Sequence, residues 1–168
     1  MAPTIRAVLD TSVLVPRRSR EALQIAAQGG LYTALWSPWI IAELNRVLVW
    51  RWIDRTGNDL SSANQKSCSR AAKAMMRILV PTFELVDARP PESTAWESLE
   101  DADDVPIWTT ALMGGATHVV SSNTRHYPPA QADGVHVYQG VTYMRSDDFL
   151  AMLYDDAGPD DDSLRHGS

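Results

Sequence analysis

Cysteine is almost absent from this 168-residue sequence, in which Cys68 is the only one. A single thiol can form neither an internal disulfide nor a cysteine-based zinc cluster, so a reducing cytoplasm is the expected compartment. Long apolar runs are missing too, because no stretch approaches the roughly 20 residues of a membrane span and Asp10 interrupts the short run near the N-terminus. We therefore expect a soluble, unexported protein with no membrane partner.

What the sequence does contain is the composition of one globular domain. A length of 168 residues supports one buried core but is too short for two ordinary domains. With 45% hydrophobic and 21% charged residues, the chain is typical of a folded protein and not of a disordered one. We expect a single domain over residues 1–154, followed by an acidic, disordered tail over residues 155–168.

A net charge of −6, if evenly spread, would argue against a nucleic-acid partner, but the charges are unevenly distributed. Residues 145–168 contain seven acids and two bases, a balance of −5. Residues 46–77 contain seven bases and two acids, a balance of +5. A basic segment beside an acidic site suits an enzyme that acts on a polyanion, although solvated helix faces explain the same charges equally well.

Strand and helix patterns alternate along the chain. Ser19 is the expected cap of the first helix, and Ser37-Pro38 is the expected start of the second. The expected strands cover about residues 5–10, 31–36, 83–86, 118–121 and 135–138, and the expected helices about residues 20–28, 37–52, 61–79, 103–113 and 146–154. This alternation predicts an α/β fold, a three-layer sandwich with a central, mainly parallel five-stranded sheet.

Polar side chains gather where such a sheet binds ligands, at the carboxyl ends of its strands. Asp10 ends the first expected strand, and Asn123 follows the fourth. Asp104 falls in the first turn of the helix that leads into the fourth strand. Glu43 lies on the rim of its helix, about 40° outside Val47 on the buried stripe. We expect these side chains to face one crevice.

Three carboxylates in one crevice repel one another, and a divalent cation removes that repulsion. Mg²⁺ and Mn²⁺ favour oxygen ligands and need only a few carboxylates beside water and phosphate oxygens. A cation held in this way supports the cleavage of phosphodiester bonds. The sequence therefore predicts a Mg²⁺ or Mn²⁺ site for phosphodiester hydrolysis.

Four segments resemble the motifs of PIN domains, in the same order and with similar spacing over about residues 5–128. The segments are Val8–Val15, Ser37–Leu44, Asp101–Ile107 with the following Ala111-Leu112 and Gly114–Ala116, and Val119–Asn123. Arg125 and Pro128 then follow as in the PIN branch that carries asparagine at the fourth position. Two features depart from the common pattern, since Asn123 stands where many relatives have aspartate and Ser122 replaces a common glycine.

The resemblance implies a specific set of site residues. The metal ligands would be Asp10, Glu43, Asp104 and Asn123, of which the three acids are the catalytic set. Ser12 and Ser121 would orient the acids or a bound water. Asp103 serves mainly as a helix cap, and Asp101 is an extra acid near the metal.

The resemblance also implies an activity and partners. PIN domains are typically Mg²⁺- or Mn²⁺-dependent ribonucleases, and many small ones are VapC-like toxins of toxin-antitoxin pairs. Such toxins are often homodimers that a DNA-binding antitoxin protein inhibits. The candidates for binding the RNA substrate are Arg51, Arg70, Lys73, Arg77 and Arg125.

Other interpretations of the same residues stay open. Asp10 alone suits a turn, Glu43 alone suits a helix surface, and Trp50 and Trp52 suit base stacking or core and dimer contacts equally well. His126 and Tyr127 suit loop packing better than catalysis. A non-catalytic PIN-like module that binds RNA or protein is the main functional alternative, and a haloacid-dehalogenase-type phosphatase is a weaker one because Ser12 stands where that family needs an acid.

Overall fold

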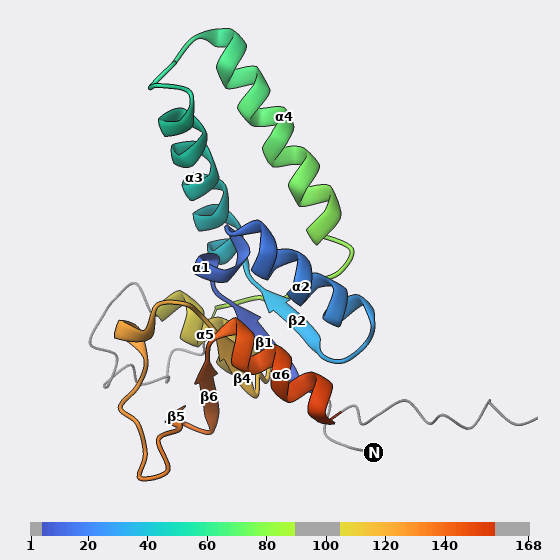
Figure 1. Cartoon of the computed structure of the whole chain (residues 1–168), viewed down its shortest axis with the longest axis vertical. Helices are drawn as coiled ribbons and strands as arrows, with labels where there is room; N and C mark the ends of the chain where they lie inside the picture. Colours follow the sequence, from blue (N-terminus) through green and yellow to red (C-terminus); the bar gives the residue numbers. More distant parts are fainter. Residues whose placement is uncertain (1–4, 90–104, 157–168) are drawn as a thin grey trace, which may run out of the picture.

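A six-stranded sheet forms the centre of the computed structural model, which describes residues 5–89 and 105–156 (Figure 1). The strands are β1 Arg6–Leu9, β2 Thr33–Trp36, β3 Glu84–Leu85, β4 His118–Val120, β5 His136–Tyr138 and β6 Val141–Met144. Their order is β3-β2-β1-β4-β6-β5, so β1 lies near the middle. All neighbouring pairs are parallel except β5 and β6, which confirms the expected mainly parallel sheet.

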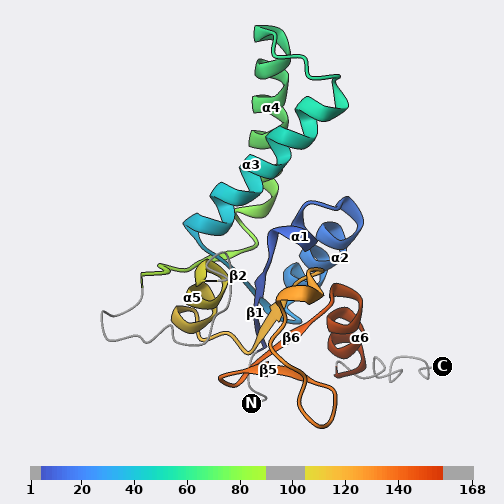
Figure 2. The ribbon, with the colours of Figure 1, turned by 90° about the vertical axis from the view of Figure 1, so that its left-hand side faces the viewer.

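Helices cover both faces of this sheet. They are α1 Thr11–Leu14, α2 Arg17–Gln28, α3 Pro38–Arg55, α4 Ser62–Leu79, α5 Val105–Met113 and α6 Ser146–Asp156, with a short 3-10 helix η2 at Thr124–His126. Figure 2 shows α5 on one face of the sheet and α2 and α6 on the other. Val8, Leu35 and Val119 pair across the central strands and are at most 1% exposed, as expected for a sheet buried on both faces.

The sixth strand is a difference from the five that the sequence predicts. The chain reverses between β5 and β6 at Gln139 and Gly140, whose φ angles are 47° and 82°. Two successive residues with positive φ make the tight turn that suits a two-residue hairpin. Gln-Gly is a weak signal for such a turn, because glutamine rarely adopts positive φ, so the second strand of the hairpin went unrecognised.

Several helix ends also differ from the predictions. The predicted Ser19 cap is wrong, because α2 begins at Arg17 after Pro16 and the Ser19 hydroxyl donates to the Val13 carbonyl at 2.7 Å. Ser37 precedes α3 as expected, but its hydroxyl is fully buried and accepts a hydrogen bond from Thr110 at 2.8 Å. Helix α6 ends at Asp156, so the first two residues of the expected tail are helical.

Helices α3 and α4 form an antiparallel pair that projects from the sheet like an arm (Figures 1 and 2). The Trp52 indole donates to the Asn64 side chain at 2.7 Å and so joins the two helices near the tip. The Ser61 hydroxyl caps α4 by accepting the Asn64 amide N–H at 3.3 Å. None of the helices in the described ranges has the length and apolar character needed to cross a membrane.

Candidate active site

The backbone of Asp10 is fixed between the sheet and helix α1. Its N–H donates to the Val120 carbonyl of β4 at 3.0 Å, which continues the β1–β4 ladder by one residue. Its carbonyl accepts the N–H groups of Val13 and Leu14 at 3.0 and 3.3 Å, the first bonds of α1. Asp10 therefore stands at the carboxyl edge of a central strand, where its side chain has little freedom to move.

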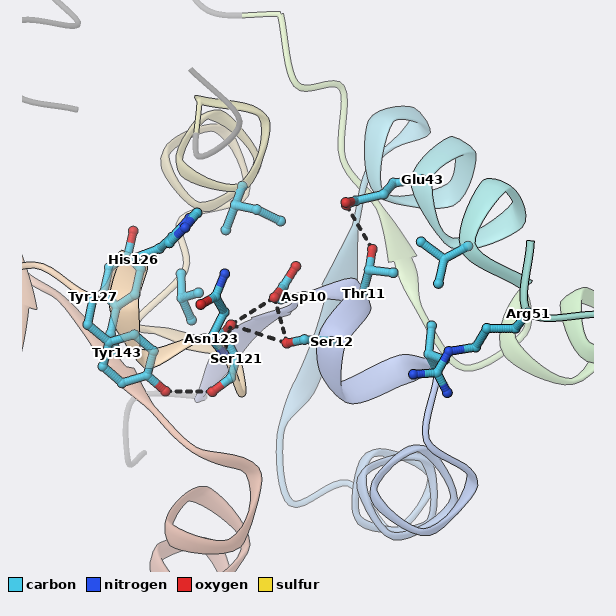
Figure 3. Close-up of a pocket in the computed structure, with 14 residues that line it drawn as sticks. Asp10, Thr11, Ser12, Glu43, Arg51, Ser121, Asn123, His126, Tyr127 and Tyr143 are labelled. Atoms are coloured by element: carbon cyan, nitrogen blue, oxygen red, sulfur yellow. Dashed lines mark hydrogen bonds between the residues drawn. The ribbon is translucent and has the colours of Figure 1, made fainter. Parts of the chain in front are cut away.

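Two serine hydroxyls hold the same oxygen of the Asp10 carboxylate and lie 3.2 Å from each other (Figure 3). Ser12 and Ser121 both donate to Oδ2, at 2.6 and 2.7 Å. Each hydroxyl in turn accepts a backbone N–H, from Ser122 at 2.9 Å and from Asn123 at 3.0 Å. Within the described part of the chain, Asp10 Oδ1 accepts no hydrogen bond, so one oxygen is positioned and the other is available.

Glu43 approaches the same pocket from helix α3 (Figure 3). The buried Thr11 hydroxyl donates to Glu43 Oε2 at 2.9 Å, so the residue after Asp10 orients the second acid. Arg46 lies 3.9 Å from Oε1, and both side chains are well exposed. Such an exposed pair contributes little, and the second carboxylate oxygen stays accessible to a ligand.

A cavity of 410 Å³ opens above these groups. Asp10, Glu43 and Asn123 line it together with Ser12 and Ser121. The remaining lining side chains are Thr11, Val15, Val47, Arg51, Ile107, Val119, His126, Tyr127 and Tyr143. The structure thus brings together the predicted residues from β1, α3 and the loop after β4.

The third predicted acid, Asp104, lies outside the described residues, as do Asp101 and Asp103. Residues 5–89 and 105–156 contain no group of three His, Cys, Asp or Glu side chains that could hold a metal. The convergence of Asp104 with Asp10 and Glu43 therefore stays a prediction. Of the five predicted RNA-binding side chains, Arg51 lines the pocket, whereas Arg70, Lys73 and Arg77 lie on α4 and Arg125 lies on η2.

Tyr127 lines the pocket, although sequence reasoning favoured loop packing over catalysis for this residue. Its hydroxyl donates to the Ser121 carbonyl at 2.5 Å, and its ring lies 5.1 Å from His136 and 5.9 Å from Tyr143. Burial raises the pKa of Tyr127 to about 12, so the hydroxyl remains a donor at neutral pH. Tyr143 was missed because it belongs to the unrecognised sixth strand.

A family model described as the PIN domain matches residues 6–125. This chain belongs to the PIN domain family. PIN domains are typically nucleases and generally use divalent metals. No curated protein is similar enough to the chain to register as a match.

The donor set of this PIN domain fits a small divalent cation. Asp10 offers a free carboxylate oxygen, Glu43 offers a second carboxylate, and Asn123 carries an amide oxygen on the same cavity wall. These are hard oxygen donors, which Mg²⁺ and Mn²⁺ prefer, and the cavity leaves room for water and phosphate oxygens. These three donors are two carboxylates, from Asp10 and Glu43, and one neutral amide, from Asn123.

Proposed function

We propose that this PIN domain is a metal-dependent endoribonuclease that hydrolyses RNA phosphodiester bonds with Mg²⁺ or Mn²⁺. One observation carries the proposal: two serines orient the Asp10 carboxylate so that one oxygen remains free in a cavity shared with Glu43 and Asn123. A carboxylate needed only for stability would be expected to use both oxygens within the protein. Membership of a nuclease family supports the same conclusion.

In this proposal Asp10, Glu43, Asp104 and Asn123 hold the cation. When bound, a divalent cation lowers the pKa of a water molecule and neutralises charge on the attacked phosphate. Ser12 and Ser121 fix the direction of the Asp10 carboxylate, and Thr11 does the same for Glu43. Tyr127 fixes the backbone of Ser121 from behind. Asp101 and Asp103 lie outside the described residues, so their roles as an extra acid near the metal and as a helix cap stay predictions.

The test compares the cutting of single-stranded RNA by the wild-type protein and Asp10→Ala, with Mn²⁺ and with a chelator. We expect cleavage only by the wild-type protein in Mn²⁺. Asp155→Ala is a matched control, because it removes an exposed carboxylate near the end of α6. Equal cutting by wild type and Asp10→Ala would identify a contaminating nuclease and overturn the proposal.

The neutral amide of Asn123 favours one other function, a PIN-like module that binds RNA or protein without cutting. Calorimetric titration with Mn²⁺ separates the two. The nuclease should bind the ion, and Asp104→Ala should weaken that binding. A module with a degenerate site should show no binding that depends on Asp104.

A narrower form of the proposal is a cytoplasmic, homodimeric toxin that an antitoxin protein inhibits. Induced expression of the wild-type protein should then arrest growth, and expression of Asp10→Ala should not. Light scattering on the purified protein measures the dimer directly. Normal growth at equal expression of both proteins would remove the toxin role and leave the nuclease proposal standing.

A further inference from the structure

A second cavity, of 760 Å³, adjoins the site pocket and lies between the arm and helix α2. Helices α2, α3 and α4 form its walls. Val15 and Arg51 line both this cavity and the site pocket, so the two cavities are neighbours at these side chains. We call the second cavity the arm groove. A long ligand bound at Asp10 would have to pass only these two side chains to reach it.

Helix α3 connects the two cavities with a single row of side chains. Glu43, Val47, Arg51 and Arg55 follow one another at intervals of four residues and change from acid through apolar to base. Glu43, Val47 and Arg51 line the site pocket, and Arg51 and Arg55 line the arm groove. The row is about 18 Å long at the rise of an α-helix, which is a length of several nucleotides.

The positive charge at the end of this row is available to a ligand. Arg51 and Arg55 form no salt bridge with any residue in the described segments. The Arg55 guanidinium lies 5.3 Å from the ring centre of the half-buried Trp52, in a cation-π contact that leaves its donors free. Arg20 is used differently, since it donates to the carbonyls of Leu14 and Val15 and so fixes the edge between the cavities.

The floor of the arm groove is apolar. Leu48 comes from α3, and Cys68, Ala71, Ala72 and Met75 come from α4. Arg70 and Arg77 of α4 point away from this floor. Arg70 lies about 160° around the helix from Ala72, and Arg77 lies about 160° from Met75. A row of arginines above an apolar floor suits a single strand of nucleic acid, in which both the phosphates and the nucleobases are exposed.

We propose that single-stranded RNA runs from the site pocket into the arm groove, with its phosphates at Arg51 and Arg55 and its bases over the apolar floor. The inference is carried by the positive charge of Arg51 and Arg55 and by the position of the arm groove beside the site pocket. It rests on the proposed function, because that function supplies the RNA strand that is cut. A duplex fits less well because its bases are already paired and stacked. The enzyme should therefore prefer unpaired RNA that extends past the scissile bond on the α3 side.

The test measures the affinity of a fluorescent single-stranded RNA by anisotropy, in a chelator so that no cutting occurs. Arg55→Gln should weaken binding about tenfold, since it removes one charged hydrogen-bond donor to phosphate. The slope of log affinity against log salt should fall by about 0.7, the value for one phosphate contact on a single strand. Arg55→Lys should keep the salt slope, because the charge remains.

Arg18→Gln is the matched control, because Arg18 is equally exposed on α2 and does not line the arm groove. Equal affinity for Arg55→Gln and Arg18→Gln would overturn the proposal and leave the arm groove to a protein partner. Loss of affinity in Arg70→Gln but not in Arg55→Gln would also overturn it, by placing the RNA on the outer face of α4.

The two proposals fail separately. If cutting depends on Asp10 but Arg55→Gln changes neither binding nor the cutting of long RNA, the nuclease proposal holds and the arm-groove proposal is wrong. If Arg55→Gln weakens RNA binding but the wild-type protein does not cut RNA in Mn²⁺, the arm groove binds RNA and the nuclease proposal is wrong.

Discussion

Strand β1 carries one charged side chain at each end, and the two are treated differently. At the amino end, Arg6 donates to the Gly114 carbonyl at 2.8 Å and to Glu84 at 2.7 and 3.3 Å, so its guanidinium is used within the protein. At the carboxyl end, Asp10 receives two hydrogen bonds on one oxygen and leaves the other free among the described residues. The amino end joins the layers of the fold, whereas the carboxyl end keeps bonding capacity for a ligand.

Asp10→Asn should show the largest difference between the two ends of β1, because it should nearly abolish activity without lowering stability. The amide keeps the shape of the side chain but loses the charge that the cation needs. We expect RNA cleavage to fall about a thousandfold, or about 4 kcal/mol of transition-state stabilisation. The melting temperature should stay the same or rise, because removing a charge near Glu43 relieves repulsion. A large loss of stability would show that Asp10 belongs to the scaffold.

Gly114→Ala should have the opposite effect at the amino end. A Cβ there would lie 2.9 Å from Leu35 Cδ1 and from the Thr110 carbonyl oxygen, and 3.0 Å from Val86 Cγ2. Overpacking of this kind costs about 2 kcal/mol, which thermal denaturation measures. Gly29→Ala is the control, because its Cβ would lie 3.4 Å from the nearest atom and should change stability by less than about 0.5 kcal/mol. Equal stability of the two variants would contradict the close packing around Gly114.

Ser121→Ala tests the serine pair that orients Asp10. The variant loses the 2.7 Å bond to Oδ2 and the acceptor for the Asn123 N–H. Loss of such a supporting group lowers metal affinity or activity by about tenfold or somewhat more. Calorimetry with Mn²⁺ measures the change, and Ser67→Ala is the control, because Ser67 lies on α4 and does not line the site pocket. Unchanged affinity would mean that Ser12 alone fixes the carboxylate.

Glu84→Gln should have the smallest effect. The hydrogen bond from Arg6 lowers the pKa of Glu84 below the ordinary value of a glutamate. Since the folded pKa is depressed, the ion pair stabilises the protein above about pH 4.5 and ceases to do so as the pH falls through the folded pKa. Glu84 is about half exposed, so we expect only about 0.5 kcal/mol at pH 7. Denaturant titrations at pH 7 and pH 3 should show a larger wild-type advantage at pH 7 than at pH 3.

The sequence predicts the carboxyl end of β1 better than the rest of the site. Asp10 was found because an acid directly after a buried strand faces the ligand edge of a parallel sheet, and Asn123 because it follows the neighbouring strand. Tyr143 was not found, because its strand follows a hairpin turn of unusual composition. For Tyr127 the sequence favoured packing over catalysis, because nothing in a single sequence places a loop tyrosine within hydrogen-bond distance of the Ser121 carbonyl.

The arm shows a second limit of sequence analysis. Counting charges found the basic segment over residues 46–77, but it treated all its bases alike. The structure separates them, because Arg51 and Arg55 line the arm groove, whereas Arg70 does not and Lys73 and Arg77 line a different cavity together with Asn45. A count of charges cannot make this distinction, since it depends on which face of each helix packs against the other.

The position of Glu43 and Arg55 on one continuous helix sets their separation independently of any loop. Glu43 at the acidic end of the cleft and Arg55 at the basic end are separated by slightly more than three turns of α3, so the helical rise fixes the distance between them. Deleting one residue between Val47 and Arg51 would rotate Arg51 and Arg55 by about 100° around the helix axis relative to Glu43, but would shorten the distance along the axis by only about 1.5 Å. The alignment of the two ends is therefore far more sensitive to the phase of this helix than to its length.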